Sequence, residues 1–347
     1  MPIVTTEHFK SGCLPFSKDG IPQVSEDDYK RLRGYKLEKD DIVFSRVGSV
    51  DINAHVGALQ DGWLFSGRVL RVRPIKTINA ECLHYVLSTE LVKRNIRNRA
   101  VGQTMPSINT PILANTKIFL PQSIVEQKKI ATLLRLIDER IATQNKIIDK
   151  LQSLIKGIVD CTILSKEKNA IVGDVCSISE QIRAEANIDD IITVRLHGNG
   201  VCKSSAENLQ LGATQYYRRR AGQLIYGKQN FHNGAIGIVP ISLDNGITSK
   251  DIPSFDIDEM KCNSVYLLAQ LQSPQYYKPA EALTTGTGSK RLKEDTFLKM
   301  PIVLPNKREQ DNIAVLIHRA SMNLDHAKRL LELLSIQKQF LLRQMFI

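Results

Sequence analysis

The apolar residues of this chain follow two different patterns along its 347 residues. Short runs rich in β-branched and aromatic residues, such as Asp41–Arg46 and Val69–Val72, lie between turn residues and predict strands. Two long segments instead carry an apolar residue at every third or fourth position, which predicts helices. Each long segment follows a group of short runs. The pattern therefore predicts two mixed α/β regions, each followed by a long helix.

The two long segments keep their apolar spacing over four heptads, and polar residues interrupt it only at Gln144 and Lys338. The first seam is Ile130, Leu134, Ile137, Ile141, Gln144, Ile148, Leu151, Ile155 and Ile158; the second is Ile313, Ile317, Ala320, Leu324, Ala327, Leu331, Leu334, Lys338, Leu341 and Met345. Seams of this length predict a coiled coil, and we expect its two helices to pair antiparallel, so that a short linker can join them. The alternative is that each helix packs only on its own domain.

A short motif precedes both long helices and defines an internal repeat. Pro305 stands at an offset of 184 from Pro121, and in both copies an apolar, strand-like run ends at the proline. Ser123 and Asn306 each lie three residues before a glutamate, a spacing that predicts a capping box at the helix start. The motif residues are Leu120, Pro121, Glu126, Gln127, Ile130 and Ala131, and again Leu304, Pro305, Glu309, Gln310, Ile313 and Ala314.

The regions before the two motifs also match each other. Gln223–Lys228 matches Asp41–Arg46 at an offset of 182, and Tyr266–Leu268 matches Tyr85–Leu87 at 181. The glycine turn that contains Gly286 stands at an offset of 184 from the turn that contains Gly102. We therefore expect two homologous domains related by a pseudo-two-fold axis.

One segment of the second region has no match in the first. Residues 171 to about 190 have no counterpart before Met1, because Ile3 already matches the strand near Thr193. We therefore expect the first domain to begin about twenty residues late and its sheet to be incomplete at one edge.

This arrangement resembles the specificity subunit of type I restriction-modification systems, over nearly the whole chain. The resemblance rests on the duplicated apolar strand, Leu-Pro, Glu-Gln, Ile-Ala and heptad helix. It implies target recognition domains at residues 1–122 and 165–305, and conserved spacer helices at residues 123–164 and 306–347. Each domain would read one half of a bipartite site on double-stranded DNA, and the helices would set the gap between the halves.

The resemblance also implies partners and a division of labour. Two modification (methyltransferase) subunits would dock on the helices and domains, supply S-adenosylmethionine and flip the target adenine. Restriction subunits would use ATP for translocation and cleavage. The chain itself would be non-catalytic and would hold no cofactor.

Composition agrees with a polyanionic partner. Lysine and arginine number 47 against 36 acidic residues, which leaves a net charge of +11 and a pI near 9.3. The six cysteines form no C-x-x-C pair, and we expect no metal site. No signal peptide and no membrane-length apolar run occur, so we expect a cytoplasmic protein without membrane contact.

Two alternative functions stay open at the level of the sequence. A standalone nucleic-acid-modifying enzyme would transfer methyl groups without partners, and salt-insensitive behaviour on a random duplex library would favour a non-DNA interaction scaffold. The sequence from Gly222 to Lys228 fits the start of a P-loop, but Gln229 replaces the hydroxyl residue that would hold magnesium. No motif typical of a methyltransferase occurs.

The candidate DNA-binding residues are basic and amide side chains at equivalent places in the two domains. Arginine can pair with guanine and glutamine or asparagine with adenine, and glycine turns present N–H groups to phosphates. The candidates are Arg46, Arg68, Arg71, Arg97, Arg99, Gln103 and Thr104 in the first domain and Arg219, Lys228, Gln229, Asn230, Ser289, Lys290 and Arg291 in the second.

Overall fold

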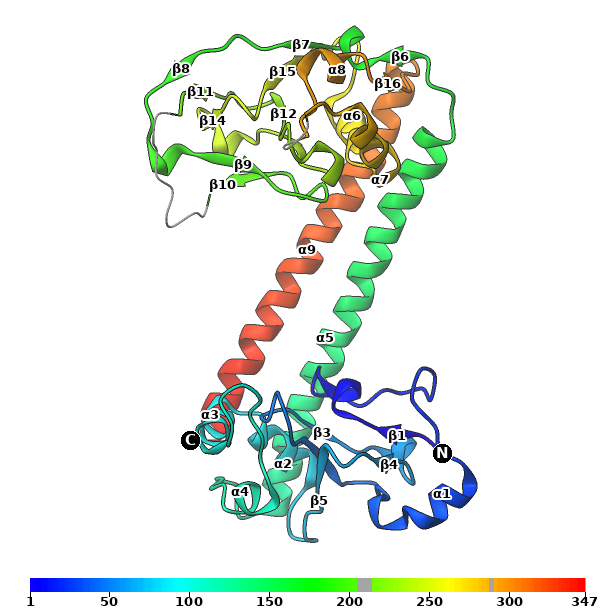
Figure 1. Ribbon diagram of the computed structural model, residues 1–347, viewed down its shortest axis with the longest axis vertical. Helices are drawn as coiled ribbons and strands as arrows, with labels where there is room; N and C mark the ends of the chain where they lie inside the picture. Colours follow the sequence, from blue (N-terminus) through cyan, green and yellow to red (C-terminus); the bar gives the residue numbers. More distant parts are fainter. Residues whose placement is uncertain (205–213, 287–289, 347) are drawn as a thin grey trace. The chain divides into compact units, whose positions relative to one another are not determined.

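The computed structural model describes residues 1–204, 214–286 and 290–346. Its contacts divide the chain into two units. Unit 1 comprises Met1–Asn145 and Arg329–Ile347, and unit 2 comprises Lys146–Lys328. Both are mixed helix and sheet, as predicted, and Figure 1 shows their elements. In the described part of the chain, no helix is both long and apolar enough to cross a membrane.

Unit 1 is built on a three-stranded antiparallel sheet in the order β3-β2-β5. Its strands are β1 (Ile3–Val4), β2 (Ile42–Ser45), β3 (Asn53–His55), β4 (Leu64–Phe65) and β5 (Val69–Val72). Its shorter helices are α1 (Glu26–Arg31), α2 (Ala80–Leu87), α3 (Glu90–Arg99) and α4 (Thr110–Ala114). Strand β2 is buried along its whole length, so the sheet has a core on both faces, and β1 pairs in parallel with β4.

Unit 2 has a four-stranded sheet in the order β13-β12-β15-β7. Its strands are β6 (Ala170–Ile171), β7 (Cys176–Ile178), β8 (Arg183–Ala184), β9 (Ile192–Val194), β10 (Val201–Lys203), β11 (Tyr216–Arg218), β12 (Leu224–Tyr226), β13 (Ile236–Ile238), β14 (Ile247–Ser249), β15 (Ser254–Ile257) and β16 (Pro301–Ile302). Its shorter helices are α6 (Ser264–Leu271), α7 (Pro274–Tyr277) and α8 (Glu294–Leu298). Strand β12 occupies the interior of the P-loop-like sequence, which is therefore not a glycine-rich loop.

The long helices are α5 (Ile124–Val159) and α9 (Lys307–Met345), and the spacing of their apolar residues predicted both. Every predicted seam residue is buried or half-buried. In unit 1, Ala131 and Leu134 of α5 pack with Leu341 and Phe346 from the end of the chain. In unit 2, the core contains Val159 at the end of α5 and the first turns of α9. Within each unit the two helical segments therefore run antiparallel.

Lys338, the charged residue of the second seam, lies in a polar cluster of unit 1. Its Nζ lies 2.5 Å from Asp138 Oδ1 and 5.6 Å from the ring centre of Tyr85. The Tyr85 hydroxyl donates to Asp138 Oδ2 at 2.9 Å. A cation within the seam is thus neutralised and stacked on an aromatic ring, so it is compatible with the packing.

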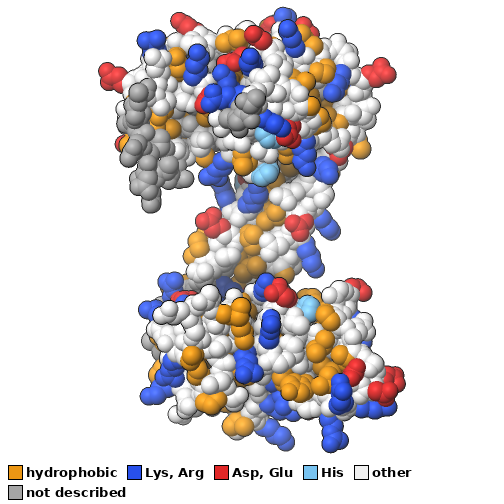
Figure 2. Space-filling view, in the orientation of Figure 1, with side chains coloured by type: hydrophobic (Ala, Val, Ile, Leu, Met, Phe, Trp, Pro, Cys, Tyr) orange, Lys and Arg blue, Asp and Glu red, His pale blue; other side chains and the backbone are white. Residues whose placement is uncertain are grey.

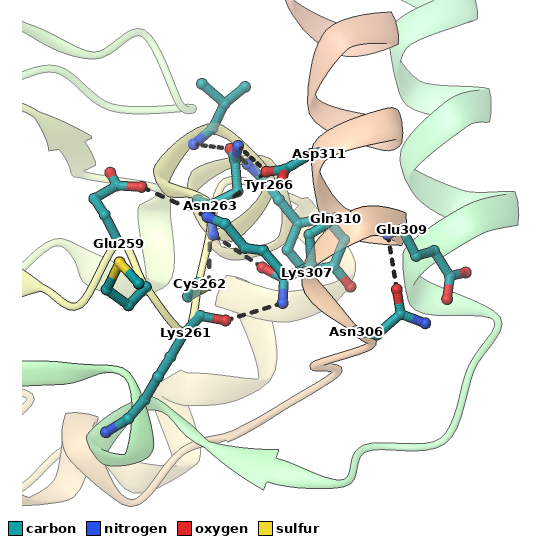
Figure 3. A network of polar contacts seen from close by, with 12 residues as sticks. Glu259, Lys261, Cys262, Asn263, Tyr266, Asn306, Lys307, Glu309, Gln310 and Asp311 are labelled. Carbon is teal, nitrogen blue, oxygen red and sulfur yellow. Dashed lines mark hydrogen bonds and ion pairs between the residues drawn. The ribbon is translucent and has the colours of Figure 1, made fainter.

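The glutamine of the repeated motif makes the same contacts in both units. Gln127 Oε1 accepts the N–H of Asn79 at 2.7 Å, and its Nε2 donates to the carbonyl of Pro121 at 2.8 Å. Gln310 accepts from Asn263 at 2.9 Å and donates to the carbonyl of Pro305 at 2.8 Å. Figure 3 shows the second network. Because Asn79 and Asn263 cap α2 and α6, each glutamine joins the start of a long helix to the start of a short one.

These contacts correct one part of the predicted alignment. Asn263 stands at an offset of 184 from Asn79, so Tyr266 is equivalent to Cys82 and not to Tyr85. The predicted offset of 181 is wrong by three residues. Three residues is almost one helical turn, and an apolar helix face matches itself when shifted by that amount.

The capping boxes form only in part. Asn306 Oδ1 accepts the N–H of Glu309 at 3.0 Å, which confirms the predicted cap of α9. The Glu309 carboxylate pairs with Lys166 instead of the start of its own helix. At the start of α5, the carbonyl of Ser123 accepts the N–H of Gln127 at 3.0 Å.

The strand expected before each motif forms in unit 2 alone. There β16 pairs with β6, whereas residues 117–120 of unit 1 have no strand assignment. An extended segment becomes part of a sheet only when a neighbouring segment forms backbone hydrogen bonds with it. In the part of unit 1 that the structure describes, no segment takes the place of β6.

Candidate nucleic-acid interface

The first candidate loop of unit 1 is a tight hairpin between Val101 and Ser107. Their backbones exchange two hydrogen bonds, at 2.9 Å from Val101 to Ser107 and 2.8 Å in the other direction. Gly102 has a φ of +101°, and a Cβ there would lie 2.8 Å from the Met105 carbonyl oxygen, so only glycine fits. Gln103 and Thr104 follow it and are exposed. The hairpin thus presents short polar side chains to solvent.

Arg46 lies beside this hairpin at the end of β2. Its carbonyl accepts the N–H of Ile108 at 2.9 Å, and its own N–H donates to the carbonyl of Arg68 at 3.0 Å. Its Nη1 donates to the carbonyl of Gly67 at 3.3 Å. Both arginine side chains are exposed. The structure therefore brings Arg46, Arg68 and the loop with Gln103 together from three segments.

Unit 2 repeats this backbone frame. Leu292 donates to the carbonyl of Lys228 at 2.9 Å, as Ile108 does to Arg46. Thr285 and Arg291 exchange two hydrogen bonds of 3.0 Å, as Val101 and Ser107 do. The predicted correspondence between the two glycine turns is therefore reproduced in the hydrogen bonding.

The side chains on the second frame are more often paired. Lys290 is exposed and lies 3.1 Å from Glu281, and Arg291 is exposed and lies 3.2 Å from Asp251. The ion pair with Lys290 lowers the pKa of Glu281. Exposed pairs of this kind are weak, so both cations can exchange their carboxylate for a phosphate. Ser289 lies outside the described residues.

Lys228, Gln229 and Asn230 continue the chain from this frame. Lys228 is mostly covered and pairs with Glu294 at 2.6 Å, which gives it a structural role. Gln229 and Asn230 are exposed. The Asn230 side chain accepts from Asn233 at 3.3 Å, so the amide residue available in this turn is chiefly Gln229.

Arg219 does not lie on the surface, and we remove it from the candidate set. It is fully buried, and its guanidinium donates to Thr248 at 2.7 Å, to Ser254 at 2.9 Å and to the carbonyl of Ile252 at 2.9 Å. Burial lowers its pKa to about 10. Its neighbours Arg218 and Arg220 are exposed, because alternate residues of an extended segment face opposite sides.

Three candidates of unit 1 are held by the protein itself. Arg71 donates to the carbonyl of Lys36 at 2.6 Å, and Arg99 donates to that of Asn115 at 2.8 Å. Arg97 pairs with Glu90 and Asp51, and both contacts raise its pKa. Arg97 and Arg99 lie on α3, a helix that the charge cluster alone did not predict.

A shallow hollow beside Arg68 was not predicted. It has a volume of about 470 Å³ and is lined by Thr5, Thr6, Glu7, Ser66, Gly67 and Arg68. The buried Ser66 hydroxyl has no hydrogen-bond partner among the described residues. The hollow depends on the pairing of β1 with β4, which joins segments sixty residues apart and leaves no local signal.

Basic side chains are visible on the surface of both units in Figure 2. Within the described ranges, no three His, Cys, Asp or Glu side chains come together in a way that could hold a metal ion. The geometry is therefore that of exposed cations and amides on hydrogen-bonded turns.

Comparison with known proteins finds similarity to one family. Residues 1–153 match the family described as type I restriction modification DNA specificity domain. Over these residues, which are less than half of the 347, the chain is similar to that specificity domain. The predicted resemblance to specificity subunits is confirmed.

Two curated relatives of this specificity domain come from Methanocaldococcus jannaschii. The type I restriction enzyme MjaVIII specificity subunit is 33% identical over 89 residues, which is 26% of this chain and 21% of the relative. The putative MjaX specificity subunit is 32% identical over 169 residues, 46% of this chain and 38% of the relative. The matches thus span less than half of each relative.

A solved structure shows the same fold. The type I restriction-modification S subunit from M. genitalium superposes with a TM-score of 0.65 at 14% sequence identity, covering 90% of this chain and 84% of that one. At this identity the likeness concerns the fold: two domains and long helices.

Proposed function

We propose that this chain is a sequence-specific DNA-binding subunit of a type I restriction-modification complex. Residues 1–122 and 165–305 act as target recognition domains, and each reads one half of a bipartite site on double-stranded DNA. The observation that carries the proposal is the duplicated frame, in which Arg46 or Lys228 is hydrogen-bonded to the residue that follows a glycine hairpin.

The exposed residues on the two frames divide into two roles. Arg46, Arg68, Lys290 and Arg291 neutralise phosphates, which gives affinity without sequence preference. Gln103 and Gln229 carry an acceptor and a donor on one group, the pattern that pairs with adenine. Base preference therefore depends on the amides and backbone affinity on the cations.

The catalytic steps belong to other subunits in this proposal. Two modification subunits dock on the helices at residues 123–164 and 306–347 and carry out methyl transfer, and restriction subunits supply ATP-dependent cleavage. This chain binds no cofactor of its own and determines where the complex acts.

The test is to express the chain with its modification subunits and map methylated adenines across a genome. We expect a two-part motif with a fixed gap. Gln103→Ala should change the preferred bases in one half and Gln229→Ala in the other, whereas Gln122→Ala, an exposed glutamine outside the frames, should change neither.

Each alternative function has its own outcome in this experiment. Methyl transfer by the purified chain without partners would replace the proposal with that of a standalone enzyme. Salt-insensitive behaviour on a library of random duplexes would favour a non-DNA scaffold.

A further inference from the structure

The hairpin between Val101 and Ser107 carries large apolar side chains as well as polar ones. Met105 is 67% exposed and Val101 is 66% exposed, so neither belongs to the core of unit 1. Gln103 and Thr104 lie between them in the sequence and are also exposed. Neither the phosphate contacts nor the base contacts proposed above use the two apolar groups. A single exposed apolar side chain is common on protein surfaces, so the setting of Met105 decides what it can do.

The backbone next to Met105 is firmly held. The carbonyl of Pro106 accepts the N–H of Gly48 at 2.8 Å, and Ile108 donates to the carbonyl of Arg46 at 2.9 Å. The proline ring also fixes its own φ. The two hydrogen bonds at the base of the hairpin close the turn on its other side. The methionine therefore stands on a rigid support, and binding through it costs little backbone ordering.

The sequence around the hairpin is basic. Residues 91–125 contain no Asp or Glu, and their cations are Lys93, Arg94, Arg97, Arg99 and Lys117. Arg97 is neutralised by Glu90 and Asp51 from outside this stretch. The exposed Arg46 and Arg68 reach the hairpin from other segments. An apolar tip in positive surroundings fits a nucleic acid, because its phosphates attract the cations and its stacked bases accept an apolar group.

The equivalent hairpin of unit 2 has polar residues at both positions. At an offset of 184, the sequence has Thr285 in place of Val101 and Ser289 in place of Met105. Thr285 keeps the backbone hydrogen bonds that Val101 makes in unit 1. The apolar side chains are therefore a property of unit 1 and are not required by the backbone frame that the two units share.

We infer that Met105 is a wedge that inserts between two neighbouring base pairs of the DNA duplex, in the half-site that unit 1 reads. The inference rests on the proposed function and adds a distortion of the duplex to it. Proteins that kink DNA insert apolar side chains in this way and partly unstack one base step. Pyrimidine–purine steps unstack most easily. The wedge therefore gives unit 1 a preference for such a step without a hydrogen bond to a base.

Fluorescence of the bound duplex tests the wedge, with the full chain in complex with its modification subunits. 2-Aminopurine, an adenine analogue that emits more strongly when it is unstacked, replaces in turn each adenine of the motif except the methylated ones. We expect the emission to rise at one step only, in the half-site whose preferred bases Gln103→Ala changes. Met105→Ala should abolish the rise and Met105→Leu should keep it. Met260→Ala is the control, because Met260 is 87% exposed in unit 2.

A nicked duplex gives a second, independent measurement. A single-strand nick keeps every base pair but lowers the cost of unstacking at its own step. The unsubstituted complex should bind a duplex nicked at the wedge step about tenfold more tightly than the intact duplex, because it no longer pays the full cost of unstacking. Met105→Ala should bind both duplexes equally. A role of Met105 in folding or in contact with a phosphate would not produce this dependence on the nick.

The outcomes separate the wedge from the proposed function. A rise in emission that survives Met105→Ala, or the same nick preference with and without the methionine, would overturn the wedge and leave DNA recognition by unit 1 intact. Tight binding without any rise or nick preference would do the same. A rise in both half-sites would contradict a wedge confined to unit 1. If the unsubstituted complex binds no duplex, the proposed function fails and the wedge fails with it.

Discussion

Gln127 binds the N-cap of a helix that lies 48 residues before it: its Oε1 accepts the N–H of Asn79 at 2.7 Å. The same side chain donates to the carbonyl of Pro121, and it is 3% exposed. Gln310 repeats both contacts in unit 2 and adds a bond to the carbonyl of Lys261 at 3.1 Å. The glutamine of the repeated motif is thus a structural residue that fixes the angle between two helices.

Gln127→Ala should therefore destabilise unit 1, because it leaves the partly buried N–H of Asn79 and carbonyl of Pro121 without this partner. We expect a loss of about 2–3 kcal/mol in the free energy of unfolding. Gln310→Ala should cost at least as much in unit 2. Urea unfolding checks both, with the exposed Gln122→Ala as control. A loss below about 0.5 kcal/mol, the lower limit for one hydrogen bond, would contradict the role.

Removal of Arg46 and Arg68 together should weaken binding to all duplexes to a similar degree. If both side chains contact phosphates, the slope of log K against log salt should fall by about 1.8. Titrations at several salt concentrations measure this slope. The control is Arg33→Ala with Arg140→Ala, two exposed arginines elsewhere in unit 1. A change confined to one DNA sequence would instead assign these arginines to base contacts.

Arg219→Met should destabilise unit 2 without a specific effect on DNA. The substitution removes the donor to the buried Thr248 and Ser254 hydroxyl oxygens and one of two donors to the Ile252 carbonyl, and we expect a cost of about 2–4 kcal/mol. Arg220→Ala, at the exposed neighbour, should leave the stability within about 0.5 kcal/mol of the original. Thermal unfolding distinguishes the two. Equal stabilities would mean that Arg219 is not held as the structure shows.

The stability of unit 1 should decrease below pH 6.5 because of His84. Burial lowers the pKa of this imidazole to about 3, and its Nδ1 lies 2.7 Å from Asn53 Oδ1. The unfolded chain takes up a proton near pH 6.5, whereas the folded chain does not, so the stability is full above pH 6.5 and is lost as the pH falls toward 3.

Because His84 keeps some exposed surface, we expect a loss of about 1 kcal/mol at pH 5 relative to pH 7.5. His84→Gln should reduce this part of the pH dependence. Unfolding curves of both proteins at pH 5, 6 and 7.5 check it. Parallel pH profiles would show that the imidazole is not the group responsible.

The long helices were the elements that the sequence predicted most reliably, because their apolar residues repeat regularly over many turns. Ten seam positions from Ile313 to Met345 define one helix face, and no other register satisfies them all. Short elements gave less information. The eight-residue helix α2 matched α6 when shifted by three residues, because one turn returns the same apolar face. The capping asparagines Asn79 and Asn263 carry the correct register.

For the candidate site, the sequence predicted which segments are equivalent in the two units. It did not predict which side chains in them face solvent. The glycine turns at Gly102 and Gly286 lie in equivalent hairpins, as their spacing indicated. Composition could not show that Arg219 faces the core while Arg218 and Arg220 face solvent, since all three carry the same charge. The direction of a side chain depends on which strand pairs with its own, and that pairing joins distant segments.

Ile108 and Arg46 are joined by a hydrogen bond between backbone atoms alone. The bond from Leu292 to Lys228 is its equivalent in unit 2. Exposed side chains at these turns, such as those of Gln103 and Thr104, can therefore be exchanged without breaking this hydrogen bond. Point substitutions can therefore change the chemistry that such a turn presents, and the two units can differ in their exposed side chains while they keep equivalent backbone hydrogen bonds.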